Sequence, residues 1–205
     1  MLYHSTIDPN TLGLLKRLQQ LPVLQDTRLV GGTALALQMG HRTSVDLNLF
    51  GQITCGTEQI RDSISSIATL IPLTESTNIH IYMIDDVKVD IVNYKYPWID
   101  SMLTNEGIRM ASAKDIAAMK VTAIVGRGRK KDFADIACLL RHFSLNEILD
   151  FYKSKYHDGS IFLALKSLAY FDDAEKSPML EMLNGQSWED IKSVVQEALC
   201  NYTPY

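Results

Sequence analysis

The pattern of apolar residues changes near residue 112, and this change limits the folds open to the chain. Before it, apolar and polar residues alternate in short runs, such as VDLNLF at 45–50, IHIYMI at 79–84 and VKVDIV at 87–92. Alternation of this kind is typical of strands. After it, apolar residues recur every three or four positions, which is the spacing of helices. We therefore expect an α+β fold in which a small mixed sheet flanked by helices precedes a helical bundle.

Cap and turn residues divide the chain into elements. Asp8 and Pro9 begin a helix, a glycine pair separates a short strand from the next helix, and Asp85-Asp86 form the bend of a hairpin. The predicted strands are 28–32, 45–50, 79–84, 87–92 and 108–112. The predicted helices are 8–20, 33–40, 57–70, 113–125, 131–142, 145–155, 160–170 and 187–200.

Length and composition are those of an ordinary globular protein. The 205 residues are 46% hydrophobic and carry a formal net charge of −4, which argues against general attraction to nucleic acid. We predict an α/β core at 1–112 and a helical domain at 113–205 packed on it. No apolar run is long enough to span a membrane, no signal peptide is evident, and three distant cysteines fit free thiols in a reducing compartment. A cytoplasmic protein without a membrane partner is expected.

The glycine pair in VGGTALAL, residues 30–37, lies between a predicted strand and a predicted helix. Glycines let backbone N–H groups approach an anion, and a helix N-terminus adds partial positive charge. The turn is a workable phosphate cradle, although many strand–helix turns contain glycine. It is not a Walker loop, because no G-x-x-x-x-G-K-[ST] motif occurs.

Two isolated carboxylates lie on predicted strands. Asp46 alternates with Val45, Leu47 and Leu49, and Asp90 lies between two apolar residues of VKVDIV. Carboxylates on neighbouring strands can converge on Mg²⁺, which favours a few carboxylates plus substrate phosphates. The alternative is that each acid simply faces solvent.

Basic side chains give two further candidates. Lys120 has only apolar residues three and four positions away on its predicted helix, so its amine either extends to solvent or meets an anion such as a triphosphate. The segment GRGRKKDFAD, 126–135, is the most basic stretch of the chain. It is either a solvated turn or a patch for a nucleotide phosphate or an RNA backbone. The aromatic residues of YKYPW, 94–98, could stack a base, but a core edge is the simpler interpretation.

In their order along residues 28 to 141, these motifs resemble the nucleotidyltransferase-fold family of AbiEii/AbiGii-type abortive-infection toxins. The resemblance rests on GGTALALQMGHRTSVDLNLF, then VDIV, then AAMKVTAIVGRGRKKDFADIACLL. It implies transfer of a nucleotidyl group from an NTP, with Mg²⁺ or Mn²⁺, to RNA such as tRNA or to a protein. It also implies a cognate antitoxin encoded nearby, which need not bind the toxin directly.

The resemblance also implies roles for individual residues. Metal binding falls to Asp46 and Asp90, with Asn48 at the remaining position, and Asp135 positions groups near the nucleotide. The implied catalytic set is Asp46, Asn48, Asp90, Lys120 and Asp135. The implied nucleotide-binding set is Gly31, Gly32, Thr33, Arg42, Ser44 and Lys120.

Asn48 departs from the family pattern, which has a second aspartate at this position. An amide oxygen can ligate a hard cation but brings no formal charge, so the more loosely held of two cations is weakened. We expect nucleotide binding with slow or absent transfer. Natural divergence and an engineered Asp-to-Asn change both fit this position.

Two other functions remain compatible with the sequence. A non-catalytic nucleotide-binding or regulatory module needs the glycine pair and Lys120 but no second carboxylate, and Asn48 favours it. A nucleotidyltransferase that modifies a small molecule such as an antibiotic needs no RNA contact, and the basic stretch is then incidental.

Overall fold

The computed structural model describes residues 1–203, which form two compact units. Unit 1 contains the sheet and unit 2 contains the helices of the second half of the chain, and the boundary between them there lies between Ala111 and Ser112. Two short segments, 41–43 and 96–101, belong to the helical unit although the chain on either side of them belongs to the sheet unit. Unit 1 comprises residues 1–40, 44–95 and 102–111, and unit 2 comprises 41–43, 96–101 and the chain from Ser112 onward.

Unit 1 is built on a mixed sheet. Among the described residues the sheet has seven strands in the spatial order β3-β4-β5-β2-β1-β7-β6. β2 runs antiparallel to β1 and parallel to β5, whereas the β4–β5 and β6–β7 pairs are antiparallel hairpins. The strands are β1 (Thr27–Leu29), β2 (Leu47–Gly51), β3 (Leu70–Glu75), β4 (Ile79–Ile84), β5 (Val87–Asn93), β6 (Leu103–Asn105) and β7 (Ile108–Met110).

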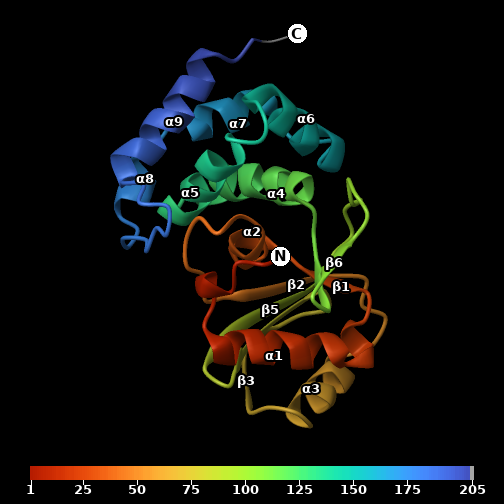
Figure 1. Ribbon diagram of the computed structural model, residues 1–205. Helices are drawn as coiled ribbons and strands as arrows, with labels where there is room; N and C mark the ends of the chain where they lie inside the picture. Colours follow the sequence, from red (N-terminus) through yellow and green to blue (C-terminus); the bar gives the residue numbers. More distant parts are fainter. Residues whose placement is uncertain (204–205) are drawn as a thin grey trace. The chain divides into compact units, whose positions relative to one another are not determined.

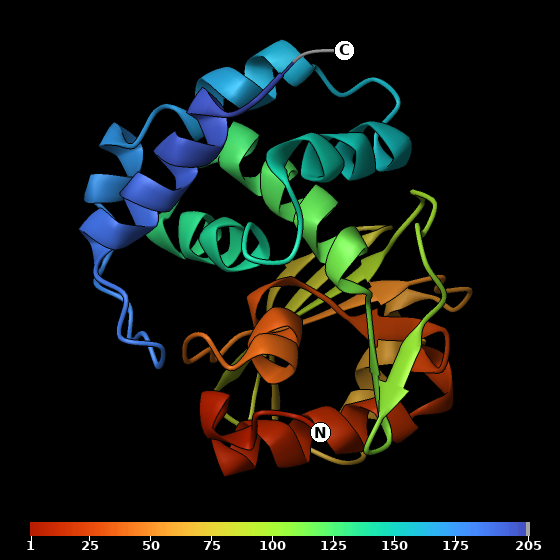
Figure 2. The same ribbon diagram turned by 45° about the horizontal axis from the view of Figure 1, so that its top comes forward.

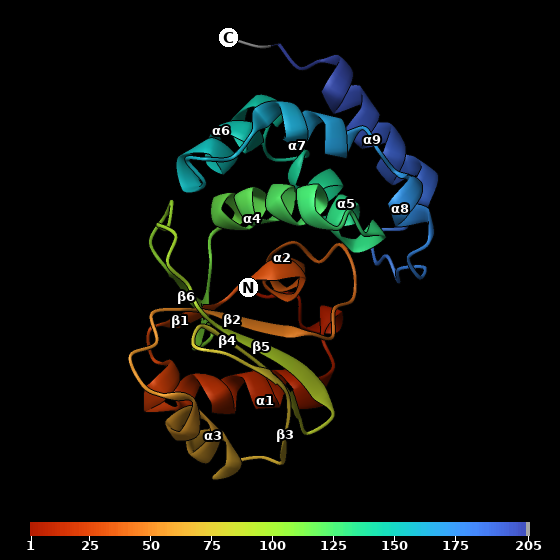
Figure 3. The ribbon, with the colours of Figure 1, turned by 180° about the vertical axis from the view of Figure 1, so that it is seen from behind.

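Helices cover both faces of this sheet. In Figures 1 and 3, α1 (Pro9–Gln20) and α3 (Thr57–Ser65) lie on one face and α2 (Gly31–Met39) lies on the other. Asp8 caps α1 by accepting a hydrogen bond from the Asn10 backbone N–H at 2.8 Å. Two 3₁₀ turns, η1 (His4–Thr6) and η2 (Pro22–Leu24), flank α1.

The alternation of the strands decides which side chains form the core of unit 1. Leu47 and Leu49 of β2 are fully buried, as are Val89 and Ile91 of β5, which are their register partners. Asn48 and Asp90 lie between these residues and face the opposite side, where they are half-buried. The sheet thus has one closed apolar face and one face that carries polar groups.

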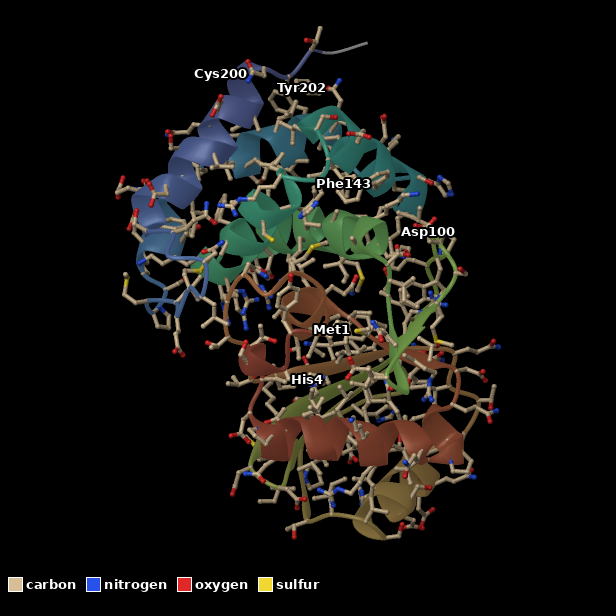
Figure 4. All side chains as sticks on the ribbon, in the orientation of Figure 1. Met1, His4, Asp100, Phe143, Cys200 and Tyr202 are labelled. Atoms are coloured by element: carbon tan, nitrogen blue, oxygen red, sulfur yellow. The ribbon has the colours of Figure 1, made fainter. Side chains whose placement is uncertain are left out.

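Unit 2 is helical. Figure 2 shows α4 between α5 and α6. Ser144 and Ser187 begin α6 and α9 with complete capping boxes. Phe143, labelled in Figure 4, packs edge-on against Phe151 of α6 with ring centroids 5.2 Å apart. The helices are α4 (Ala113–Gly126), α5 (Lys130–Leu139), α6 (Leu145–Lys155), α7 (Ile161–Leu168), α8 (Asp172–Glu175) and α9 (Trp188–Cys200).

The predicted fold class, a mixed sheet flanked by helices and followed by a helical bundle, is confirmed, but several elements differ from their predictions. The helix predicted at 57–70 ends at Ser65, because the chain turns there into the edge strand β3, which was not predicted. Strand β6 and the short helix α8 were also missed. Val45 does not share the buried face of Leu47, because it precedes β2 and is 67% exposed. Among residues 1–203, every helix is too short or too polar to cross a bilayer.

Candidate functional site

The N-terminus of α2 is exposed by a glycine turn. Val30 is in the extended conformation, and Gly31, the first residue of α2, has φ +72°, which L residues with a side chain rarely adopt. Within the described chain no side chain caps this helix end. Backbone N–H groups at this end therefore remain available to an anion, and the helix dipole favours negative charge there.

Thr33, in the first turn of α2, holds the segment that precedes β2. Its hydroxyl donates to the backbone carbonyl of Asp46 and lies 2.8 Å from the hydroxyl of Ser44. Thr33 is only 1% exposed, so water does not compete for these bonds. The loop from Ser44 to Asp46 is thereby fixed against the start of α2.

Asn48 connects the glycine turn to the polar face of the sheet. Its backbone carbonyl accepts from the Val30 N–H at 2.9 Å, and a Cβ atom on Gly31 would lie 3.2 Å from its Nδ2. Asn48 is the register partner of Asp90 on the parallel strand β5, so both side chains share one face. Asp46 immediately precedes β2 and is half-buried, and its backbone carbonyl is held by Thr33.

Lys88 belongs to the same face and was missed in the sequence. Its amine lies 2.7 Å from Oδ1 of Asp90, two residues along β5. The side chains are 41% and 24% exposed, respectively. The alternation of VKVDIV places both residues on one side of the strand, and this signal could have identified Lys88.

The donor set of unit 1 suits one hard cation better than two. Asp46 and Asp90 offer carboxylate oxygens and Asn48 an amide oxygen, which are the ligand types that Mg²⁺ accepts. Between Met1 and Thr203, however, no group of three or more His, Cys, Asp or Glu side chains is arranged to hold a metal. A neutral amide at the central position and an ammonium beside Asp90 both reduce the negative charge of this face.

The other predicted site residues meet in unit 2, around the fully buried carboxylate of Asp135. Arg42 donates to both of its oxygens, from Nε at 2.7 Å and from Nη2 at 2.9 Å. The ring nitrogen Nε2 of His41 lies 2.8 Å from Oδ1, and the Lys120 amine lies 2.5 Å from Oδ2. Burial by itself raises the pKa of Asp135, but the charges of Arg42 and Lys120 and the hydrogen bonds from His41 and Arg42 hold it well below its usual value.

Lys120 also meets a second buried carboxylate. Its amine lies 3.0 Å from Oδ1 of Asp132, which accepts two further bonds from Arg127. Burial opposes ionisation of Asp132, yet the positive charges of Lys120 and Arg127 lower its pKa. Of the two alternatives for Lys120, extension to solvent is wrong, because the side chain is 6% exposed. The anions that it contacts are the carboxylates of α5.

The predicted basic stretch is only partly a surface feature. Lys130 is buried, and its amine donates to the backbone carbonyls of Glu175 at 3.4 Å and Ser177 at 3.2 Å. Arg129, the N-cap residue of α5, is exposed.

The aromatic stretch 94–98 is divided between the units. Tyr94 packs on Phe50 in unit 1. In unit 2 the amine of Lys155 lies over the ring of Trp98, 4.4 Å from the ring centroid.

The predicted site residues thus form two groups, one in each unit. The first contains the glycine turn and the polar face of the sheet, and the second contains the buried ion network. The group in unit 1 is Gly31, Gly32, Thr33, Ser44, Asp46, Asn48 and Asp90, and the group in unit 2 is Arg42, Lys120 and Asp135.

Comparison with known proteins decides the family. Residues 13–193 match the family described as nucleotidyl transferase AbiEii toxin, type IV TA system. The chain belongs to this family. It is 31% identical over 194 residues to an uncharacterized protein of Aquifex aeolicus strain VF5, a match that covers 92% of this chain and 93% of that one.

Solved structures of low sequence identity share the fold. MenT4, a nucleotidyltransferase toxin from Mycobacterium tuberculosis H37Rv, superposes with a TM-score of 0.61 at 12% identity, covering 93% of this chain and 81% of that one. JHP933 from Helicobacter pylori gives a TM-score of 0.56 at 18% identity, covering 95% and 94%. The resemblance stated from the sequence motifs is therefore confirmed at the level of family and fold.

Proposed function

We propose that this chain transfers a nucleotidyl group from an NTP to an acceptor hydroxyl, and that the polar face of unit 1 carries the reaction. The observation that supports this most directly is the junction of Gly31 with Asn48 and Asp90. It joins an uncapped helix N-terminus, suited to phosphate, to oxygen ligands suited to a hard cation. Membership of a nucleotidyl transferase family agrees with this use of the face.

The transfer follows from groups that the face offers. The triphosphate binds at the start of α2, where Gly31 and Gly32 leave the backbone accessible, while Thr33 and Ser44 hold the loop that carries Asp46. The acceptor oxygen bonds to the α-phosphorus as the bond to pyrophosphate breaks, and the proton of the acceptor hydroxyl is released to water. Asp46 and Asn48 would hold a divalent cation, which would supply charge stabilisation at the phosphoryl oxygens.

The network in unit 2 supports a different role for Arg42, Lys120 and Asp135 from the one implied by the resemblance. Three groups of Arg42 already donate, two to Asp135 and one to the Thr43 carbonyl at 2.8 Å. Lys120 is shared by two carboxylates. We propose that these residues stabilise the helical unit and fix segment 41–43 on α5. Contact with phosphate or nucleotide stays a prediction for them.

A second candidate is a nucleotide-binding module that does not transfer, and Asn48 favours it. Both candidate functions include NTP binding, but only the nucleotidyltransferase transfers label to an acceptor.

For the nucleotidyltransferase, we propose an RNA such as tRNA or a protein as the acceptor, together with a cognate antitoxin and action in the cytoplasm. The type IV description of the family supports the antitoxin.

The test uses the purified chain with each of the four α-³²P-labelled NTPs, Mg²⁺ or Mn²⁺, and total tRNA. Asn48→Asp runs in parallel, and Asp46→Asn is the negative control. We expect weak label from the chain, stronger label from Asn48→Asp and none from Asp46→Asn. Ribonuclease or protease sensitivity of the label identifies the acceptor. If the unaltered chain and Asn48→Asp both bind NTP but neither produces label, the non-catalytic module is selected. If neither NTP binding nor label is detected, the proposal is overturned.

The basic stretch separates an RNA acceptor from a small molecule. Because Lys130 is buried and bonded to backbone carbonyls, reversing its charge would disturb the fold. The exposed Arg129 is the suitable position. Arg129→Glu is expected to weaken the binding of an RNA acceptor in a salt-dependent manner and to leave the binding of a small-molecule acceptor unchanged.

A further inference from the structure

Lys88 changes the charge of the candidate face in unit 1. Its amine contacts Asp90 at 2.7 Å, and Asp90 lies beside the neutral Asn48. The partners of Lys88 and Asp90 on β4 are Met83 and Ile81, so that strand offers no other acid for the amine. Together, Asp46, Asn48, Lys88 and Asp90 carry a net formal charge of −1.

This charge is low for a pair of divalent cations. Two such ions repel each other, and carboxylates around them have to offset that repulsion even when a triphosphate is bound. Here one of three ligand positions is an amide, and the carboxylate of Asp90 already has an ammonium partner.

We propose that this face binds a single divalent cation, held by Asp46 and Asn48, and that the ammonium of Lys88 supplies the second positive charge beside Asp90. The inference rests on the proposed function and specifies how the site is charged. A lysine amine is a compact point charge on a flexible stem with three donors. Since the Lys88 side chain is 41% exposed, its amine can contact both Asp90 and a phosphate oxygen of a bound nucleotide.

The direct test counts bound ions. Mn²⁺ is titrated into the folded chain with a saturating NTP analogue that has a methylene bridge between the α- and β-phosphorus, and free Mn²⁺ is measured by electron paramagnetic resonance. We expect one Mn²⁺ per chain. The double variant Asn48→Asp with Lys88→Met, which restores one carboxylate and removes the ammonium, is expected to bind two.

Lys114 provides a matched control for Lys88. It is also 41% exposed and pairs with Asp100 at 3.4 Å in unit 2. Lys88→Met is expected to weaken binding of the analogue at least tenfold and Lys88→Arg to restore most of it, whereas Lys114→Met leaves it unchanged. Equal thermal stability of the two methionine variants separates this effect from unfolding.

The outcomes distinguish the inference from the function on which it rests. Two Mn²⁺ ions on the unaltered chain, or unchanged analogue binding in Lys88→Met, overturn the inference while nucleotidyl transfer stands. If the chain binds neither Mn²⁺ nor the analogue, both the inference and the proposed function are overturned. One ion on the chain and two on the double variant support the inference.

Discussion

Asp90 in unit 1 and Asp135 in unit 2 are both paired with cationic side chains, but water reaches only the first. Asp90 is 24% exposed and has Lys88 as its partner, whereas Asp135 is fully buried and has Arg42, Lys120 and His41 around it. An exposed pair can exchange its partner for a ligand at little cost, while a buried one cannot. This difference supports the proposed ligand site on the face of unit 1 and the proposed stabilising role of the network of unit 2.

The largest effect is expected from Asp135→Asn. Neutralising this carboxylate leaves Arg42 without its buried counter-charge, and we expect a loss of about 3–5 kcal/mol in the free energy of unfolding. Asp90→Asn is the matched control, because it makes the same chemical change at a half-exposed site and costs less than about 1 kcal/mol. Urea denaturation measures both. Equal losses would abolish the distinction between the two regions.

Lys155→Met tests the second buried pair of unit 2. The amine of Lys155 lies 2.7 Å from both Asp115 Oδ1 and the Pro97 carbonyl, and neither charged side chain is exposed. We expect a loss of about 3 kcal/mol, because Asp115 is left buried without its cation. Lys176→Met, at an exposed pair with Asp173, is expected to change stability by less than about 0.5 kcal/mol. Comparable urea midpoints for both variants would contradict this account.

Acid is expected to destabilise unit 2. The pKa values of Asp132 and Asp135 are lowered in the folded chain by Lys120, Arg127 and Arg42. Their contribution is complete above the unfolded value of about 3.9 and is lost as the pH falls through the folded values. Unfolding free energy measured from pH 7 to pH 2 should therefore decline below about pH 4, and less steeply in Asp135→Asn. A gain in stability over this range would contradict the assignment.

Gly31→Ala tests the glycine turn at smaller cost. The positive φ penalises a side chain by about 1–2 kcal/mol, and the new Cβ would contact Asn48. We expect reduced stability and weaker NTP binding, both measured by thermal shift with and without nucleotide. Gly13→Ala is the control, because Gly13 lies in α1 with open space around its Cβ position, and it should stabilise the chain by about 0.5–1 kcal/mol. Unaltered NTP binding in Gly31→Ala would remove the turn from the site.

Among the charged residues of the candidate face, only a small stability effect is expected at Lys88. Its pair with Asp90 is partly solvated, so Lys88→Met should change the free energy of unfolding by less than about 1 kcal/mol. Urea denaturation checks this value. A larger loss would show that the pair stabilises unit 1, and the functional interpretation of this face would then need revision.

The sequence predicted features whose causes are local. The cap at Asp8, the hairpin bend at Asp85-Asp86 and the alternation that turns Asn48 and Asp90 to one face each depend on a few neighbouring residues. Edge strand β3 was missed, because LIPLTE is largely exposed and does not alternate clearly. Its position depends on pairing with β4.

The sequence could not predict which residues would pair with the buried charged side chains. The apolar neighbours of Lys120 showed that its amine needs an anion, but not that the anion would be Asp132 and Asp135. The pairing of Arg42 with Asp135 joins residues 93 positions apart and follows from tertiary packing alone. Asp46 and Asp90, by contrast, were predicted because each stood alone on a predicted apolar strand, and their roles stay predictions; Asp46 precedes β2 in the structure.

The central claim is that the face of unit 1 carries nucleotidyl transfer. Its most direct test compares label transfer from α-³²P-labelled NTPs by Asn48→Asp with that by the same chain carrying Asp46→Asn as well, both verified to be folded by their thermal midpoints. The account predicts labelled acceptor from the first and none from the second, at midpoints within about 2 °C of each other. Equal labelling by both chains would place the chemistry elsewhere and contradict the claim.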